Sequence, residues 1–358
     1  MCGRSKAAST AGWSAAILWT VSIGLSTPVH SAVIAPPPAV TYKQPQVAVR
    51  GNVVGVAFGS GNAMFFAKST DGGRTFGAPV KVAEPGVTAI GMHRGPRVVM
   101  TPSAIVISAV YGEKGKGADG DLLAFRSTDG GATWSKGVRV NDRAASAREG
   151  LHAMAADGEF VYAAWLDDRS GGKELYGAAS TDGGATWTAN RRIYHSSDRT
   201  ICECCHPSVA VRGGGREIYA MFRNWLGGSR DLWLATSTDG GDSFSARKLG
   251  EGTWPLNACP MDGGGLVVDA KGPLTVWRRG STVYLDRAGS LEVEIGPGRN
   301  PTLVADTVLW SAPDGLREKR GSSESILLDT SGAYPAGAGD IAAWEHDGAI
   351  RIEMLARE

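Results

Sequence analysis

Four of the five cysteines in this 358-residue chain fall in two short segments. Three lie in the run Cys202-Glu203-Cys204-Cys205-His206, and the fourth lies in Cys259-Pro260-Met261. Thiolate, imidazole and thioether groups are soft or borderline ligands, which favour Cu(I) and then Zn(II). The sequence therefore predicts a metal site with copper favoured and zinc as runner-up, built from Cys202, Cys204, Cys205, His206, Cys259 and Met261.

Two other states of the same cysteines stay open. Disulfides are common in exported proteins, and the Cys202–Cys205 spacing closes easily, which would leave Cys204 to pair with Cys259. Adjacent and i+2 cysteines form strained rings, so other pairings are disfavoured. The third state is a set of redox-active thiols without a metal.

The elements that must position these cysteines are set by a repeat. Four segments read S-T-D-G-G-x-[TS]-[WF], at residues 69–76, 127–134, 180–187 and 237–244. The aspartate can bond backbone N–H groups a few residues on, the Gly-Gly pair permits positive φ, and the aromatic ring begins the next strand. We therefore interpret these Asp boxes as structural turns, rather than as calcium or catalytic sites.

Short strand patterns around each box predict four-stranded blades. First strands recur at residues 44–49, 95–100, 150–155, 206–211, 264–269 and 300–305, and the last two lack a box. The expected fold is an all-β, six-bladed propeller in a single domain over residues 44–358, with seven blades as the alternative. Residues 340–355 form a strand–turn–strand pattern that closes the ring with the N-terminal segment or belongs to a seventh blade.

This topology brings the two cysteine segments together. Each directly precedes the first strand of a blade, and the two blades are consecutive along the chain. First strands of a propeller line its central channel, so we expect both segments at one rim of that channel, on the face opposite the Asp-box turns.

The Asp boxes resemble those of the sialidase superfamily, whose BNR repeats lie on six-bladed propellers. The resemblance covers most of the chain from about residue 42. It implies a glycosidase that clamps a carboxylate with three arginines and uses a tyrosine–glutamate nucleophile with an aspartate as acid/base. Lys43 stands where the first arginine is expected and lacks the planar fork of a guanidinium. The catalytic candidates under this resemblance are Lys43, Asp121, Arg169, Arg223 and Arg299.

Polar residues expected on the same rim would suit a small anionic or carbohydrate ligand. They are Arg94, Arg169, Arg223, Asn224 and Arg299. Three functions therefore compete: a propeller with a soft-metal or thiol site, an exo-α-sialidase-type hydrolase of anionic sugars, and an interaction scaffold stapled by disulfides. Whether the protein is an enzyme, and which protein partner it has, stays open.

The N-terminus predicts export. Arg4 and Lys6 precede an apolar stretch over residues 11–25, and small residues follow up to Ala32. We expect a signal peptide at residues 1–32, a Pro-rich lead-in at 33–43 and a periplasmic or secreted protein. With 37 basic and 36 acidic residues, the net charge of +1 argues against nucleic-acid binding, and no later segment is apolar enough to span a membrane.

Overall fold

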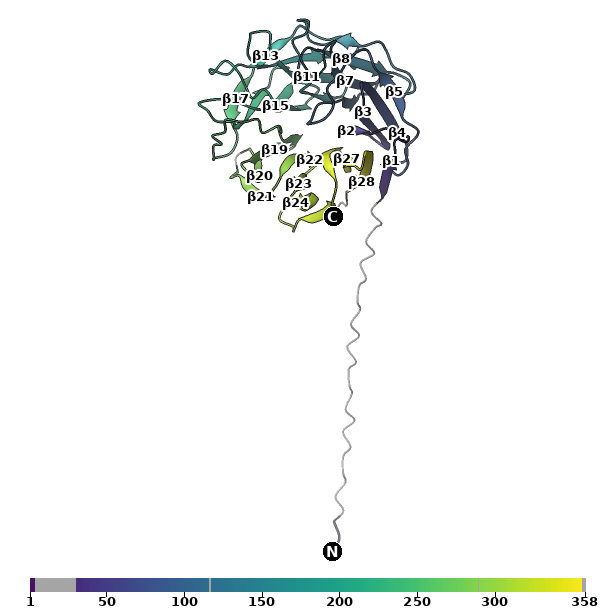
Figure 1. Cartoon of the computed structure of the whole chain (residues 1–358). Coiled ribbons are helices and arrows are strands. Elements are labelled where there is room, and N and C mark those ends of the chain that lie inside the picture. Colours follow the sequence, from purple (N-terminus) through teal and green to yellow (C-terminus); the bar gives the residue numbers. More distant parts are fainter. Residues whose placement is uncertain (4–29, 116, 289, 356–358) are drawn as a thin grey trace.

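The computed structural model describes residues 1–3, 30–115, 117–288 and 290–355, and most of the expected signal peptide lies outside these residues. The described chain forms 28 strands in seven four-stranded sheets, which follow one another around a ring (Figure 1). It contains no helix, and hence none that could cross a membrane. The all-β propeller is thus confirmed, with seven blades instead of the preferred six.

The first four blades are those that carry Asp boxes. Blade one contains β2 (Lys43–Arg50), β3 (Val53–Ser60), β4 (Ala63–Ser69) and β5 (Val80–Ala83). Blade two contains β6 (Arg97–Met100), β7 (Ile105–Tyr111), β8 (Asp121–Ser127) and β9 (Val138–Arg139). Blade three contains β10 (His152–Asp157), β11 (Phe160–Asp167), β12 (Glu174–Ser180) and β13 (Arg191–Tyr194). Blade four contains β14 (Ser208–Arg212), β15 (Glu217–Arg223), β16 (Leu232–Ser237) and β17 (Ser245–Lys248).

The remaining three blades lack the box. Blade five contains β18 (Gly265–Asp269), β19 (Gly272–Arg279), β20 (Thr282–Arg287) and β21 (Val293–Pro297). Blade six contains β22 (Arg299–Val304), β23 (Thr307–Ala312), β24 (Gly315–Arg320) and β25 (Ile326–Asp329). Blade seven contains β26 (Ala333–Ala338), β27 (Ile341–His346), β28 (Ala349–Met354) and, as its outermost strand, β1 (Ser31–Ile34).

Blade seven closes the ring by joining the two ends of the chain. β1 pairs antiparallel with β28, with Ile34 opposite Ile350, so the purple and yellow ends of the ribbon lie side by side in Figure 1. The strand–turn–strand pattern at residues 340–355 therefore does both things expected of it: it belongs to a seventh blade, and it pairs with the N-terminal segment. The propeller accordingly begins at Ser31 instead of residue 44, because part of the expected lead-in is a strand.

The seventh blade opens with a motif that blades one and six share. Gln44, Asn300 and Tyr334 each precede a proline, have φ of 56°, 51° and 51°, and lie at a bulge between the first two strands of their blade. The proline is tolerated because the first strand is the free inner edge of each sheet, where no ladder partner needs its missing N–H. Tyr334-Pro335 is therefore the signal in the sequence that marks the seventh blade.

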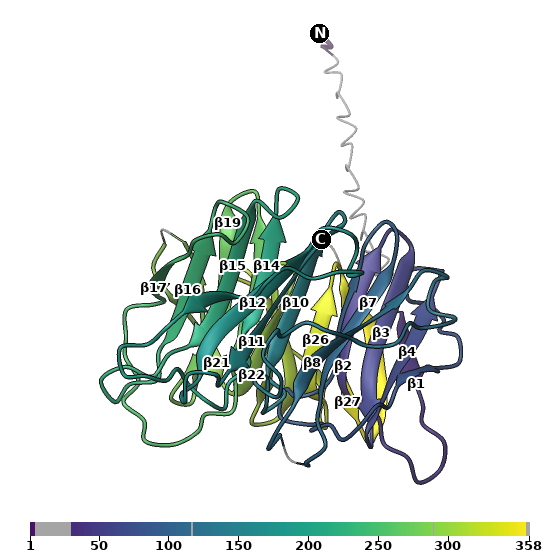
Figure 2. The same ribbon diagram turned by 90° about the horizontal axis from the view of Figure 1, so that it is seen from above.

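Packing between consecutive blades builds the core. The second strand of each blade contributes large side chains that are almost fully buried, among them Trp165, Trp310 and Trp344. Blade faces pack against each other around the ring, so each blade needs its neighbours on both sides. Seen from the side, the strands run roughly along the ring axis (Figure 2), which places successive loops at opposite ends of the channel.

The Asp boxes lie at one of these ends and act as turns. In the first box, Oδ1 of Asp71 accepts hydrogen bonds from the Ser69 hydroxyl at 2.7 Å and the Thr75 N–H at 3.0 Å, and Oδ2 accepts one from the Thr75 hydroxyl at 2.6 Å. The other three boxes repeat this bonding around Asp129, Asp182 and Asp239. These bonds lower the pKa of each aspartate, that of Asp182 to about 2. Each carboxylate therefore stabilises its own turn.

Candidate thiolate site at the rim of the axial channel

Three cysteines meet in the loop that leads into β14. The Sγ atoms of Cys202 and Cys205 lie 3.2 Å apart, those of Cys202 and Cys204 3.7 Å, and those of Cys204 and Cys205 4.0 Å. The side chains are nearly inaccessible, at 1%, 7% and 2% exposure for Cys202, Cys204 and Cys205. Among the described residues, these three are the one group of His, Cys, Asp or Glu side chains that converges closely enough to hold a metal ion.

Two arginines give this sulfur cluster a positive environment. Nη1 of Arg230, in the loop after β15, donates to Sγ of Cys202 at 3.0 Å. The backbone carbonyl of Arg223 accepts a hydrogen bond from the Cys202 N–H at 3.0 Å and fixes the start of the loop. Hydrogen bonding with Cys204 and Cys205, assisted by the charge of Arg223, lowers the pKa of Cys202. These contacts favour the charged form of the Cys202 sulfur, while burial raises the pKa of Cys205.

The second cysteine segment reaches the cluster from the loop that precedes blade five. Met261 packs against the three buried cysteines. Cys259 is exposed, and after Cys202 it is a further neighbour that contributes to the raised pKa of Cys204. The structure thus brings together the two segments that the sequence placed at one rim. All four of these cysteines are free thiols, and the closest sulfur pair is Cys202–Cys205, the pair with the favourable spacing.

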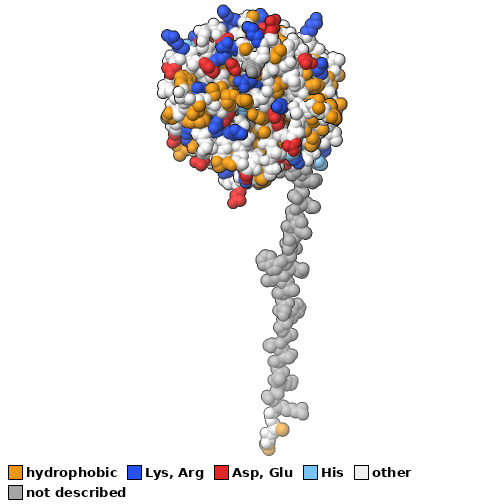
Figure 3. All heavy atoms as spheres, in the orientation of Figure 1, with side chains coloured by type: hydrophobic (Ala, Val, Ile, Leu, Met, Phe, Trp, Pro, Cys, Tyr) orange, Lys and Arg blue, Asp and Glu red, His pale blue; other side chains and the backbone are white. Residues whose placement is uncertain are grey.

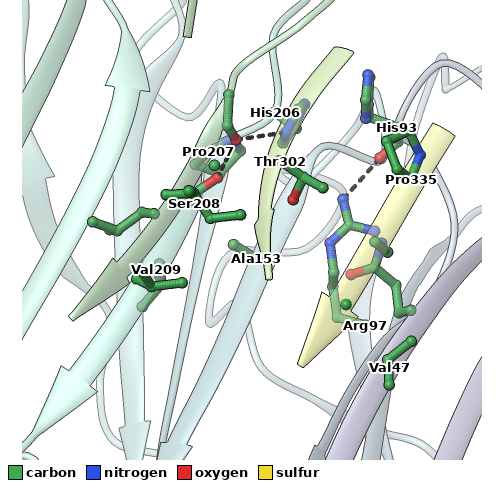
Figure 4. Close-up of a pocket in the computed structure, with 18 of the residues that line it drawn as sticks. Val47, His93, Arg97, Ala153, His206, Pro207, Ser208, Val209, Thr302 and Pro335 are labelled. Carbon is green, nitrogen blue, oxygen red and sulfur yellow. Dashed lines mark hydrogen bonds between the residues drawn. The ribbon is translucent and has the colours of Figure 1, made fainter. Parts of the chain in front are cut away.

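His206 does not join the sulfur atoms, contrary to the sequence prediction. Its Nδ1 accepts a hydrogen bond from the Gly263 N–H at 3.2 Å, and its Nε2 lies 3.3 Å from the Gly264 carbonyl oxygen. Its ring stacks on that of His93, with centroids 4.2 Å apart, and both histidines line the axial cavity (Figure 4). His206 therefore lines the channel, because the backbone of Gly263 and Gly264, just before blade five, holds its imidazole there.

A buried carboxylate holds the two loops in register. Asp262 follows Met261, and its Oδ2 lies 2.7 Å from Nε of Arg278, while its Oδ1 lies 3.4 Å from Nη2 of Arg223. Both guanidinium groups also lie over the indole of Trp254, with central carbons 5.2 Å and 5.0 Å from a ring centroid. This cluster of charge and aromatic surface connects blades four and five directly beside the sulfur atoms.

Three of the four predicted ligand-binding arginines are already engaged in ion pairs with acidic side chains. Arg169 bonds Asp167 at 2.8 Å and Asp142 at 2.9 Å, and Arg94 donates to the Glu149 carboxylate at 3.2 Å. Arg223 is held by Asp262, as described. Asn224 donates to the Tyr194 hydroxyl at 3.0 Å and leaves its buried Oδ1 without a partner among the described residues.

The catalytic candidates do not converge on the cavity. Lys43 and Arg299 are exposed, and Asp121 accepts hydrogen bonds from Asn141 at 2.7 Å and the Ala145 N–H at 2.6 Å. None of Lys43, Asp121, Arg169, Arg223 and Arg299 lines the axial cavity. The arrangement of these residues therefore gives no carboxylate clamp of three arginines around that cavity.

Sequence reasoning missed two arginines that the structure makes prominent. Arg230 was not singled out, because its contact with Sγ of Cys202 joins the loop after β15 to the cysteine loop, and no local sequence pattern signals it. Arg97 lies at the start of β6 and lines the axial cavity. The sequence feature that could have indicated Arg97 is its position directly after Gly95-Pro96, which corresponds to the position after the proline that opens other blades.

The fold and its boxes define the class of protein: an all-β, seven-bladed propeller with Asp-box repeats. Residues 123–262, from the third strand of blade two to the loop before blade five, match the family described as a BNR repeat-like domain. This match supports the resemblance that the Asp boxes indicated. No curated protein matches the chain.

Solved structures share the propeller at low sequence identity. A protein of unknown function from Dyadobacter fermentans is 16% identical, with 91% of this chain and 98% of that chain covered and a TM-score of 0.53. An α-L-arabinofuranosidase from Fusarium graminearum is 14% identical, with coverages of 91% and 97% and a TM-score of 0.53. An α-L-arabinanase from Penicillium chrysogenum is 14% identical, with coverages of 80% and 94% and a TM-score of 0.54. At these identities the likeness extends to the fold alone.

Proposed function

We propose that this propeller is an exported soft-metal-binding protein, whose site is the sulfur cluster of Cys202, Cys204 and Cys205. The observation that carries the proposal is the convergence of three buried sulfurs with spacings of 3.2, 3.7 and 4.0 Å. An ion held about 2.3 Å from each sulfur at tetrahedral angles separates the sulfurs by about 3.8 Å, so small side-chain movements suffice to bind it.

Copper(I) fits the surroundings of this site best. Met261 packs against the cysteines and supplies a thioether, a soft ligand that suits Cu(I). Three thiolates around a monovalent ion leave net negative charge, and Arg230 already donates to one of these sulfurs. Zinc is the runner-up: with Cys259 turned inward as fourth ligand, the set would become four thiolates, a common structural zinc site.

The decisive experiment measures metal content and free thiols on protein purified without air. Reconstitution with Cu(I) or Zn(II) should give one ion per chain, and the double variant Cys204→Ser with Cys205→Ser should bind none while its circular dichroism stays that of the folded propeller. Asp242→Asn, which changes an exposed side chain in an Asp box at the opposite end of the propeller, is the control and should bind normally. A double variant with full metal occupancy would refute the assignment.

Two further variants distinguish the metals. Met261→Leu should weaken Cu(I) more than Zn(II), whereas Cys259→Ser should weaken Zn(II) more than Cu(I). If the protein takes up neither metal anaerobically, and air removes all four clustered thiols as disulfides, the scaffold interpretation replaces the metal site.

A glycosidase activity is the second candidate, since the propeller fold is shared with enzymes that act on carbohydrates. The test is release of the chromophore from a chromogenic sialoside, with Lys43→Ala as the variant. The metal site takes precedence because its residues converge, whereas the catalytic candidates lie apart from the axial cavity.

A further inference from the structure

The axial cavity is a second site, separate from the sulfur cluster. It has a volume of about 200 Å³ and is lined by first strands from all seven blades. This space holds several water molecules or one small ion with part of its hydration shell. The cavity is therefore large enough for a small ligand.

One position near the start of each first strand faces its neighbours around the ring. The residues at this position pair with the second strand of their blade and are Gln46, Arg97, His152, Ser208, Gly265, Thr302 and Ala336. All of them except His152 line the cavity. Burial strongly lowers the pKa of His152, so Arg97 carries the one full charge in this ring at neutral pH.

Arg97 is buried without a counter-ion. Arg97 is only 7% exposed. Its guanidinium donates to the carbonyl oxygens of Pro96 and His93, each at 2.8 Å, and Figure 4 shows the bond to His93. No carboxylate among the described residues forms an ion pair with it. The other buried arginine, Arg223, has Asp262 as its partner. A guanidinium has five N–H donors, so Arg97 retains donors beyond these two bonds.

An unpaired buried cation is unfavourable unless a charge of opposite sign reaches it. Burial lowers the pKa of Arg97 to about 10, so the group is still charged at neutral pH. The hydroxyl of Thr302 and the amide of Gln46 line the same space and can donate further hydrogen bonds. The cavity thus presents donors and one positive charge with no internal anion.

We infer that the axial cavity binds one small oxyanion, either an inorganic phosphate or sulfate or a simple carboxylate, on the guanidinium of Arg97. A guanidinium matches both groups because two of its N–H donors can reach two oxygens of one anion. The inference uses no residue of the sulfur cluster, and the two sites can therefore succeed or fail independently.

Thermal unfolding of the full chain tests the inference. Phosphate, sulfate and acetate are titrated at constant ionic strength, with chloride as the balancing anion. The expected result is a saturable rise in Tm with at least one oxyanion, from which a Kd follows. A stronger effect of phosphate or sulfate assigns the site to inorganic oxyanions, and a stronger effect of acetate assigns it to carboxylates. Equal effects of all anions, chloride included, would overturn the proposal.

Variants locate the site. Arg97→Gln should weaken the preferred oxyanion at least tenfold, and Arg97→Lys should lie between Arg97→Gln and the wild type. Arg299→Gln removes an exposed arginine on the same rim and should leave the Kd unchanged. Unchanged binding by Arg97→Gln would disprove the role of Arg97.

A crystal of the wild-type protein soaked in selenate gives a readout that does not depend on the stability of a variant. Anomalous density within hydrogen-bond distance of the Arg97 guanidinium supports the inference. Selenate on the outer surface alone would mean an adventitious ion only, and would overturn it.

Discussion

The Asp-box turns and the cysteine rim occupy opposite ends of the same propeller and are built on opposite principles. In a box, the hydrogen bonds of the aspartate carboxylate form within the box itself, as in Ser69 to Phe76. At the rim, the contacts join loops far apart in the sequence, as between Arg230 and Cys202 or Arg223 and Asp262. A locally complete motif can be repeated in four blades without change, whereas the rim exists at a single junction between blades.

This difference predicts how each end responds to mutation. Mutation of a box aspartate should destabilise the turn that it forms and leave the rest of the propeller unchanged. Mutation of a rim residue leaves its buried partner on another loop without a hydrogen bond or counter-charge. This lowers the free energy of unfolding more than the loss of a solvent-exposed contact does.

The largest effect on folding is expected for Asp262→Asn. The change leaves the Arg223 and Arg278 guanidinium groups without their buried carboxylate and should lower the free energy of unfolding by about 3–5 kcal/mol. Denaturant unfolding measures it. The control is Asp242→Asn, which breaks the exposed pair with Arg191 and should change stability by less than about 0.5 kcal/mol. Similar losses for both variants would contradict the comparison.

The next effect concerns the metal. Cys202→Ser removes the sulfur that Arg230 contacts and should weaken Cu(I) at least ~100-fold, about 2.7 kcal/mol. Competition with a Cu(I) chelator gives the affinity, and Asp242→Asn serves again as the control. An affinity within about threefold of the wild type would show that Cys202 is not a ligand.

The pH dependence separates the two ends. Burial lowers the pKa of His93 to about 4 and also lowers that of His206. Below the usual pKa of 6.5, these histidines are therefore protonated in the unfolded chain while they stay neutral in the folded one. Stability should therefore fall as the pH drops from about 6.5 to 4, by up to about 2 kcal/mol at pH 5 for His93 alone. Asp182 has a folded pKa of about 2, so its contribution is complete above pH 3.8 and is lost only below it.

Unfolding measured from pH 7 to pH 4.5 checks this dependence. Burial raises the pKa of Glu318, Glu345 and Glu353, which acts in the opposite sense, so the share of His93 is the difference in slope between the variant and the wild type. His93→Gln should flatten the slope, and Asp182→Asn should leave it unaltered. The facing charges of Asp262, Arg97 and Arg94 also contribute to the pKa of His93. A slope unaffected by His93→Gln would remove the buried histidine as its cause.

The smallest effect is expected for Asp182→Ala. The variant loses the side chain that accepts hydrogen bonds from Ser180 and Thr186 and should be destabilised by about 1 kcal/mol. Metal affinity and oxyanion affinity should both equal those of the wild type. A large loss of either affinity at unchanged stability would overturn the structural interpretation of the boxes.

Much of the fold was accessible from the sequence because its signals are local. The four boxes and the six first strands were found correctly, and β27 and β28 follow the pattern seen around Asp347-Gly348. β26 escaped because Ala333–Ala338 has few strong strand formers, and only its Tyr-Pro opening marks it. β1 escaped because its partner lies at the other end of the chain.

The site was predictable as a meeting of segments but not in its details. Blade topology alone brought Met261 to the cysteines. The orientation of His206 depends on the backbone of Gly263 and Gly264, and no spacing rule encodes that. For the same reason, the sequence could not show which arginines find carboxylates and which, like Arg97, do not.

The pairing of Ser31–Ile34 with Ala349–Met354 makes the ring a clasp whose two halves are the first and last strands of the described propeller. Its formation requires the longest-range contact in the fold, so we expect it to be a late step in folding. Until it forms, β28 presents a free sheet edge to any strand that can add to it. Removal of β1 would thus leave the edge of β28 unpaired in the closed ring, where a strand from a second molecule could pair with it.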